Sequence, residues 1–103
     1  LLGGTAGYND DEKVQVNHGQ GQLYLKQKEY DKAIEQFKLN LPLNPQKEKW
    51  LVPEAHYQIG RCYLRMGNKK EAVMWFDKAM DIDYDYDFKD SMEGKIKNEI
   101  TKF

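Results

Sequence analysis

The chain has little cysteine, almost no net charge and no long hydrophobic run. One cysteine, Cys62, in 103 residues excludes an internal disulfide framework and any metal site built from several thiolates. Sixteen basic and seventeen acidic residues leave a formal net charge of −1, which is a poor electrostatic footprint for a nucleic-acid or anionic-membrane binder. No run approaches the ~18 apolar residues of a membrane-spanning helix.

The first ten residues, LLGGTAGYND, also lack the basic region and apolar stretch of a signal peptide. The chain does not begin with Met, and we interpret it as a fragment or processed product of a longer protein. Its cysteine usage suits a reducing compartment, so we expect a cytoplasmic location.

What the sequence does contain favours one small folded domain. Hydrophobic residues make up 40% of the chain and aromatic residues 13%, which is more than a disordered chain carries. The hydrophobic positions recur at helical intervals among Lys, Glu and Gln, and no segment reads firmly as a strand. We therefore predict an all-α fold.

Turn residues divide the chain into five predicted helices. A break at residues 27–29 separates the first two, and Pro42 with Pro45 ends the second. We expect Pro53 to open a third helix that stops at residues 66–68, and a fourth from about residue 69 to 81 with Ala72, Val73, Phe76, Ala79 and Met80 on one face. A last amphipathic helix follows, with Asp90 and Glu93 spaced as a capping box.

The sequence repeats itself at an offset of 39 residues. GQLYLKQKEYDKAIEQF (residues 21–37) aligns with GRCYLRMGNKKEAVMWF (residues 60–76). Small residues allow two antiparallel helices to approach closely, and aromatic residues fill the space beside them. The matching pairs are Gly21/Gly60, Tyr24/Tyr63, Leu25/Leu64, Ala33/Ala72, Ile34/Val73 and Phe37/Phe76.

This small–aromatic–Ala–aromatic pattern resembles the tetratricopeptide repeat family. The resemblance implies a right-handed α-solenoid of two helix–turn–helix repeats closed by a capping helix. We accordingly expect a flexible lead-in (1–9), a first repeat (10–45), a connector (46–52), a second repeat (53–84) and a capping helix (85–103). The segments KWLVPEAHYQIG, GNKKEAV and DSMEGKIKNEI also resemble the C-terminal end of a eukaryotic tetratricopeptide family that includes fungal inclusion-body clearance proteins.

Several positions depart from the family pattern. Asn17 and His56 stand where the family prefers a large apolar residue, and Tyr84 replaces its closing proline. Five extra residues, 48–52, lengthen the junction between the repeats. In that junction, Trp50 either clamps the connector onto the first repeat or serves as a binding anchor.

The resemblance implies a non-catalytic protein-interaction module. In this family the first helix of each pair lines a concave groove that holds a peptide or helix of a partner protein. Carried over to this chain, the groove residues are Gln15, His18, Gln22, Lys26, Tyr57, Arg61, Arg65 and Lys95.

Two other roles fit the same resemblance. One is a structural end-cap that contacts upstream repeats of its own chain, and the other is an adaptor that holds the C-terminal carboxylate of a chaperone. For the adaptor, His18 and Gln22 occupy the places of the first Lys and Asn of the clamp, which is therefore incomplete.

No residue pattern indicates catalysis, a metal or a cofactor. The run Asp81, Asp83, Asp85 and Asp87 lacks the Gly and Glu that a calcium loop needs in register, and we interpret it as a solvated link. His18 and His56 have no metal-binding spacing, and Cys62 has no visible base. An enzyme would need a convergent set of titratable groups that the sequence does not show.

Overall fold

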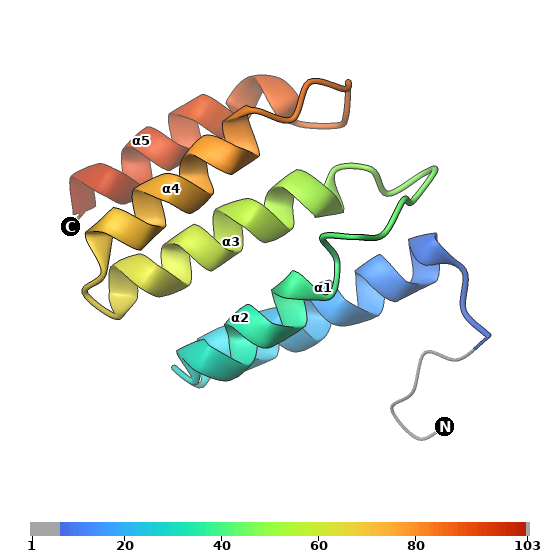
Figure 1. Ribbon diagram of the computed structural model, residues 1–103, viewed down its shortest axis with the longest axis horizontal. Coiled ribbons are helices and arrows are strands. Elements are labelled where there is room, and N and C mark those ends of the chain that lie inside the picture. The colour runs from blue at the N-terminus through green and yellow to red at the C-terminus, as the bar shows by residue number, and fades with distance from the viewer. Residues whose placement is uncertain (1–6, 103) are drawn as a thin grey trace.

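The computed structural model describes residues 7–102, in which every regular element is a helix and no strand occurs (Figure 1). Most of the expected lead-in, residues 1–6, lies outside the described residues. The helices are α1 (Asp10–Lys26), α2 (Tyr30–Lys38), α3 (Leu51–Arg65), α4 (Lys69–Met80) and α5 (Met92–Lys102), with a 3₁₀ turn, η1 (Lys89–Ser91), before α5.

Two helices begin at asparagine caps. The Asn9 side chain accepts a hydrogen bond from the amide of Glu12, whose carboxylate in turn accepts one from the Asn9 amide. Asn68 caps α4 by accepting from the Glu71 amide. These side chains satisfy backbone donors that the first helical turn leaves without partners.

Three predicted boundaries were wrong by a few residues. The α2 helix ends at Lys38, before the first proline, because residues 39–41 bond three residues back and Pro42 disfavours helical backbone at its neighbour. The α3 helix begins at Leu51, so Pro53 is its third residue, still inside the first turn where no amide donor is needed. Asp90 lies inside η1 and not at the helix cap.

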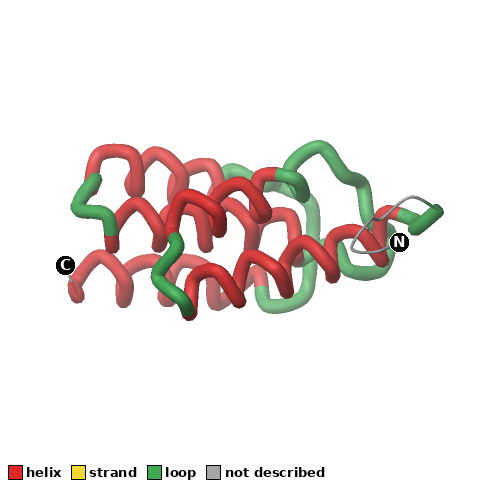
Figure 2. Tube along the Cα trace, turned by 90° about the horizontal axis from the view of Figure 1, so that it is seen from below, coloured by secondary structure: helices red, strands yellow, loops and turns green. Residues whose placement is uncertain are grey.

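The helices form two hairpins and a final single helix. Helices α1 and α2 form the first pair, α3 and α4 the second, and α5 follows on the far side of the second pair (Figure 1). Seen from below, the helices stack in two layers with their axes roughly aligned (Figure 2). Helix α3 contacts all four other α-helices, which explains why eleven of its fifteen residues are buried.

The glycines of the repeat lie against its phenylalanines. A Cβ atom on Gly21 would lie 2.6 Å from the Phe37 ring, and one on Gly60 would lie 2.5 Å from the Phe76 ring. Because the same contact recurs in both hairpins, the register deduced from the sequence holds in the structure.

One face of α4 differs from the prediction. Ala72, Phe76 and Ala79 are buried as expected, but Val73 and Met80 are exposed. Trp75 takes a core position instead, in a cluster that includes Ile34 and Phe37 of α2. It therefore couples the second repeat to the first.

The connector between the repeats is fixed by α1. The carboxylate of Asp11 accepts hydrogen bonds from the amides of Gln46, Lys47 and Glu48 at 3.2, 2.8 and 2.8 Å. These hydrogen bonds lower the pKa of Asp11, and the bond from the Glu48 amide has the largest effect. Trp50 lies edge-on to both His18 and Phe88, so it links the connector to α1 and to the segment before α5.

Candidate functional site

A hollow of about 270 Å³ lies between the two repeats. It is open to solvent, and its walls come from α1, the turn after it, the start of α2, and α3. We call it the α1/α3 hollow, and its lining residues are Gln22, Leu25, Lys26, Lys28, Tyr30, Arg61 and Arg65.

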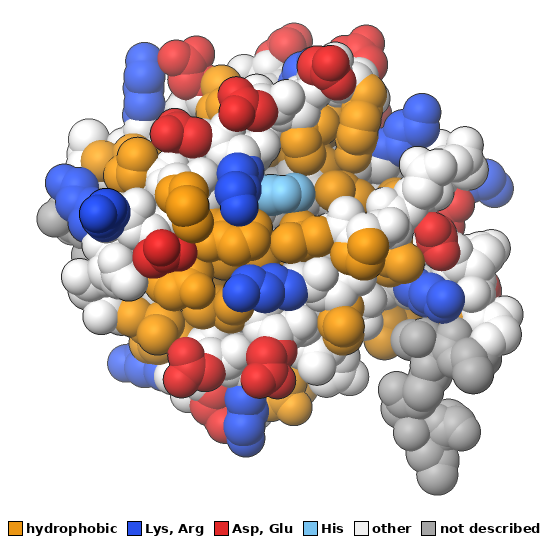
Figure 3. Space-filling model, in the orientation of Figure 1, with side chains coloured by type: hydrophobic (Ala, Val, Ile, Leu, Met, Phe, Trp, Pro, Cys, Tyr) orange, Lys and Arg blue, Asp and Glu red, His pale blue; other side chains and the backbone are white. Residues whose placement is uncertain are grey.

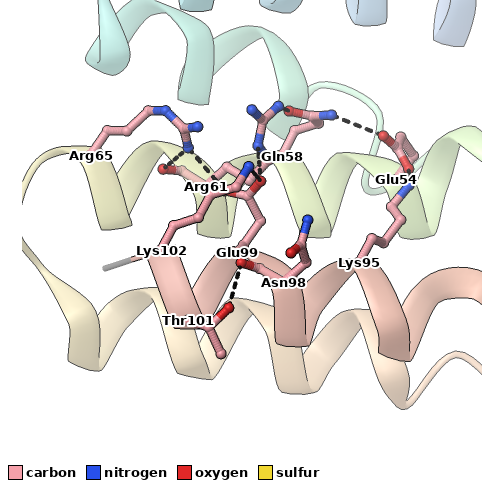
Figure 4. Close-up of polar contacts among 9 residues, drawn as sticks. All are labelled: Glu54, Gln58, Arg61, Arg65, Lys95, Asn98, Glu99, Thr101 and Lys102. Carbon is pink, nitrogen blue, oxygen red and sulfur yellow. Dashed lines mark hydrogen bonds and ion pairs between the residues drawn. The ribbon is translucent and has the colours of Figure 1, made fainter.

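Two arginines of the hollow are held from the side of α5 (Figure 4). Arg61 Nε lies 3.3 Å from one carboxylate oxygen of Glu99, and Arg65 Nη1 lies 3.2 Å from the other. Arg61 also donates to the Gln58 side chain at 2.9 Å. Burial by itself would raise the pKa of Glu99, but Arg61, Arg65 and Lys102 outweigh it and lower that pKa. Glu99 therefore stays ionised and orients both guanidinium groups.

A second ion pair joins α3 to α5 near Tyr57. Lys95 Nζ donates to Glu54 at 2.6 Å and lies 4.4 Å from the centre of the Tyr57 ring (Figure 4 shows the ion pair). Tyr57 is only 6% exposed. Burial, with the nearby charge of Glu99, raises its pKa to about 12, so it stays a neutral phenol. Glu54, Tyr57 and Lys95 therefore hold α5 against α3 and do not form an open binding surface.

The structure places Cys62 in the hydrophobic core. The Cys62 side chain is fully buried, and burial raises the pKa of its thiol to about 11, which leaves no thiolate nucleophile at neutral pH. Among residues 7–102, no group of three or more His, Cys, Asp or Glu side chains is placed to hold a metal ion.

The face that is turned towards the viewer in Figure 1 carries exposed hydrophobic side chains. A band of hydrophobic side chains crosses its middle, bordered by Lys, Arg and a histidine (Figure 3). Independently of that face, Trp75 has Lys78 Nζ 4.3 Å and Lys38 Nζ 5.6 Å from its ring centre, and it is only 7% exposed because it packs in a cluster with the first repeat. Its role is packing, with two cation–π contacts above it.

A family model for the tetratricopeptide repeat matches residues 12–85, which span both hairpins and the connector. The chain belongs to the tetratricopeptide repeat family. Neither curated proteins nor solved structures yielded a match. Tetratricopeptide repeats generally mediate protein–protein interaction. Within the described part of the chain, none of the helices has both the length and the hydrophobicity to cross a bilayer.

The tetratricopeptide fold brings together only some of the groove residues that the sequence predicts. Gln22, Lys26, Arg61 and Arg65 line one hollow. Tyr57 and Lys95 lie instead at the contact with α5. His18 packs against Phe37 and Trp50, and burial lowers its pKa, so it is neutral at neutral pH. Gln15 is exposed and bonds back to the Asp11 carbonyl within α1.

Sequence reasoning missed four contributors to this site. Lys28 lies in the helix break, Tyr30 begins α2, Leu25 lies on α1 and Glu99 lies on α5. The repeat alignment held a signal for Lys28, because it pairs Lys28 with Gly67. A lysine at a position where the second copy uses glycine is a local conflict that a packing role does not explain.

Proposed function

We propose that the chain is a non-catalytic interaction module that binds a peptide or helical segment of a partner protein across α1 and α3, with the α1/α3 hollow at the centre of the site. One observation carries the proposal: residues at equivalent positions of the two repeats line one hollow that is open to solvent. Gln22 and Lys26 of the first repeat meet Arg61 and Arg65, which lie 39 residues later in the sequence. An extended or helical peptide is the ligand such a surface fits.

The two alternative roles find less support. The adaptor role needs a cation in the place of His18, and that ring is neutral and packed between Phe37 and Trp50. The end-cap role is consistent with α5, which buries Met92 and Ile96 against the second repeat, but it gives no reason for a hollow lined by four cations. We propose a cytoplasmic location, because the buried, unpaired Cys62 suits a reducing compartment.

Selection from a random peptide library displayed on phage tests the proposal. The parent protein should enrich a set of peptides, and the double variant Gln22→Ala/Lys26→Ala should lose about threefold to tenfold in affinity for them, because both side chains line the hollow. Fluorescence anisotropy with synthetic copies of the enriched peptides measures the change.

The matched control is Gln20→Ala/Lys69→Ala, which removes the same side-chain types at exposed positions outside the hollow. It should bind as the parent does, and both variants should keep the parental melting temperature. If no peptide is enriched, or if the two variants bind equally, the proposal is wrong and the end-cap role takes its place.

A further inference from the structure

The α1/α3 hollow is a concentration of positive charge in a chain that is nearly neutral overall. Lys26, Lys28, Arg61 and Arg65 line it, and none of its lining residues within the described chain is acidic. Glu99 pairs with both arginines, and it also pairs with Lys102. The lining of the hollow is therefore positive, although Glu29 and Asp31 lie beside Lys28 and Tyr30 in an adjoining hollow.

The two lysines of the hollow are exposed towards solvent. Within residues 7–102, neither Lys26 nor Lys28 has a carboxylate partner within ion-pair distance. Arg61 and Arg65, by contrast, are oriented by the buried Glu99, which is 4% exposed. The hollow thus combines two pre-oriented guanidinium groups with two uncommitted ammonium groups.

The backbone at Lys28 gives an independent indication. Lys28 has a φ of 61°, in the left-handed region, and its repeat counterpart Gly67 has a φ of 83°. The two turns share their hydrogen bonds: Lys28 donates to Leu25 and Gly67 donates to Leu64, both at 3.0 Å. A side chain at positive φ is strained, whereas glycine is not.

The first repeat therefore tolerates strain in order to place a lysine where the second repeat uses glycine. The Lys28 side chain is exposed and lines the hollow. Strained residues of this kind concentrate at binding sites, where the side chain serves the ligand rather than the fold.

We infer that the α1/α3 hollow binds an acidic segment of the partner protein, with Lys26 and Lys28 pairing with Asp or Glu side chains. This inference rests on the proposed function and specifies the chemistry of its ligand. The two arginines, which Glu99 orients, add positive charge to the same wall. Leu25 and Tyr30, in the same wall, offer apolar contact to the rest of the segment.

The peptide library tests this chemistry directly, provided that both ends of each peptide are fused to coat protein, so that only side-chain carboxylates are present. Peptides enriched by the parent should be rich in Asp and Glu, and their binding should weaken as salt is raised. Lys28→Gly should weaken binding by about threefold to tenfold while the melting temperature holds or rises, because the strain is removed.

A charge-reversal pair provides the matched control. Lys26→Glu/Lys28→Glu should abolish binding of the acidic peptides, whereas Lys69→Glu/Lys70→Glu changes the net charge equally at exposed positions outside the hollow and should bind nearly as the parent does.

Three outcomes would overturn the inference. Enriched peptides without an acidic bias, if still weakened by Gln22→Ala/Lys26→Ala, would refute the acidic ligand and leave the proposed function intact. Acidic peptides weakened equally by the two charge-reversal pairs would refute this location. A library that yields no binder would refute the proposed function and this inference together.

Discussion

At the residue scale, the repeat glycines set how closely the two helices of each hairpin approach. Phe37 and Phe76 fill the space that a side chain on Gly21 or Gly60 would need. Gly19 lies two residues from Gly21 on the same helix, yet nothing lies within 4 Å of where its Cβ would be. Two glycines on one helix therefore have opposite packing environments.

This contrast makes a prediction for alanine substitutions. Gly60→Ala should destabilise the protein by about 1–3 kcal/mol, because the added methyl group overlaps the Phe76 ring. Gly19→Ala should stabilise it by about 0.5–1 kcal/mol, because alanine is the better helix former and the site is open. Urea denaturation measures both. Equal effects of the two substitutions would contradict the packing register.

Asn17 and His56 occupy positions where the family prefers a large apolar residue, and both form hydrogen bonds. Asn17 donates to the buried Asn40 side chain at 3.0 Å, and Asn40 donates to the Val14 carbonyl at 3.1 Å. His56 lies 2.8 Å through Nδ1 from the Val52 carbonyl and contacts the Trp75 ring. Hydrogen bonding makes these positions acceptable in the core.

At the element scale, α5 is held by charge as well as by hydrophobic packing. Met92 and Ile96 are buried against the second repeat, and Glu99 lies between Arg61, Arg65 and Lys102. The same residue thus docks α5 and orients the arginines of the α1/α3 hollow.

Glu99→Gln should therefore destabilise the protein at neutral pH, by about 1–3 kcal/mol, since it leaves two half-buried arginines without their carboxylate. The folded-state pKa of Glu99 is lowered from 4.5, so its contribution is complete above pH 4.5 and is lost as pH falls through the lower folded value. Thermal melts of parent and variant should differ at pH 7 and converge in acid.

Glu93→Gln is the control for this prediction. Glu93 pairs with Lys97 on the exposed side of α5 at 3.5 Å, and both side chains are largely in solvent. The substitution should change the melting temperature little. A gap between the parent and Glu99→Gln that stays constant with pH would contradict the electrostatic explanation.

At the scale of the whole molecule, α3 makes the two repeats one unit. It contacts α1, α2, α4 and α5, and Trp75 of the second repeat shares a core cluster with Ala33, Ile34 and Phe37 of the first. Neither hairpin can bury its hydrophobic face without the other.

We therefore expect the two repeats to unfold together. In a Trp50→Phe variant, Trp75 is the single tryptophan and reports the contact between repeats. Its fluorescence and the far-ultraviolet circular dichroism should give the same urea midpoint. A fluorescence transition that precedes the loss of helix would show that the repeats separate before they unfold.

The sequence by itself determined the all-α class, the break at residues 27–29 and the contact of Gly21 and Gly60 with the phenylalanines. It also named four of the residues that line the hollow, out of eight predicted groove residues. These features follow from local turn chemistry and from a packing motif written twice in the chain. Helix boundaries near Pro42 and Pro53 differ by a few residues because the turn after α2 bonds three residues back and because proline fits anywhere in the first turn of a helix.

Only the tertiary structure decided the composition of the α1/α3 hollow. Glu99 engages Arg61 and Arg65 across 38 and 34 residues of sequence, and Tyr57 becomes buried because α5 docks beside it. Periodicity shows which face of a helix is polar, but it does not show which distant charge will meet that face. That pairing depends on how α5 packs against the second repeat, which no local pattern specifies.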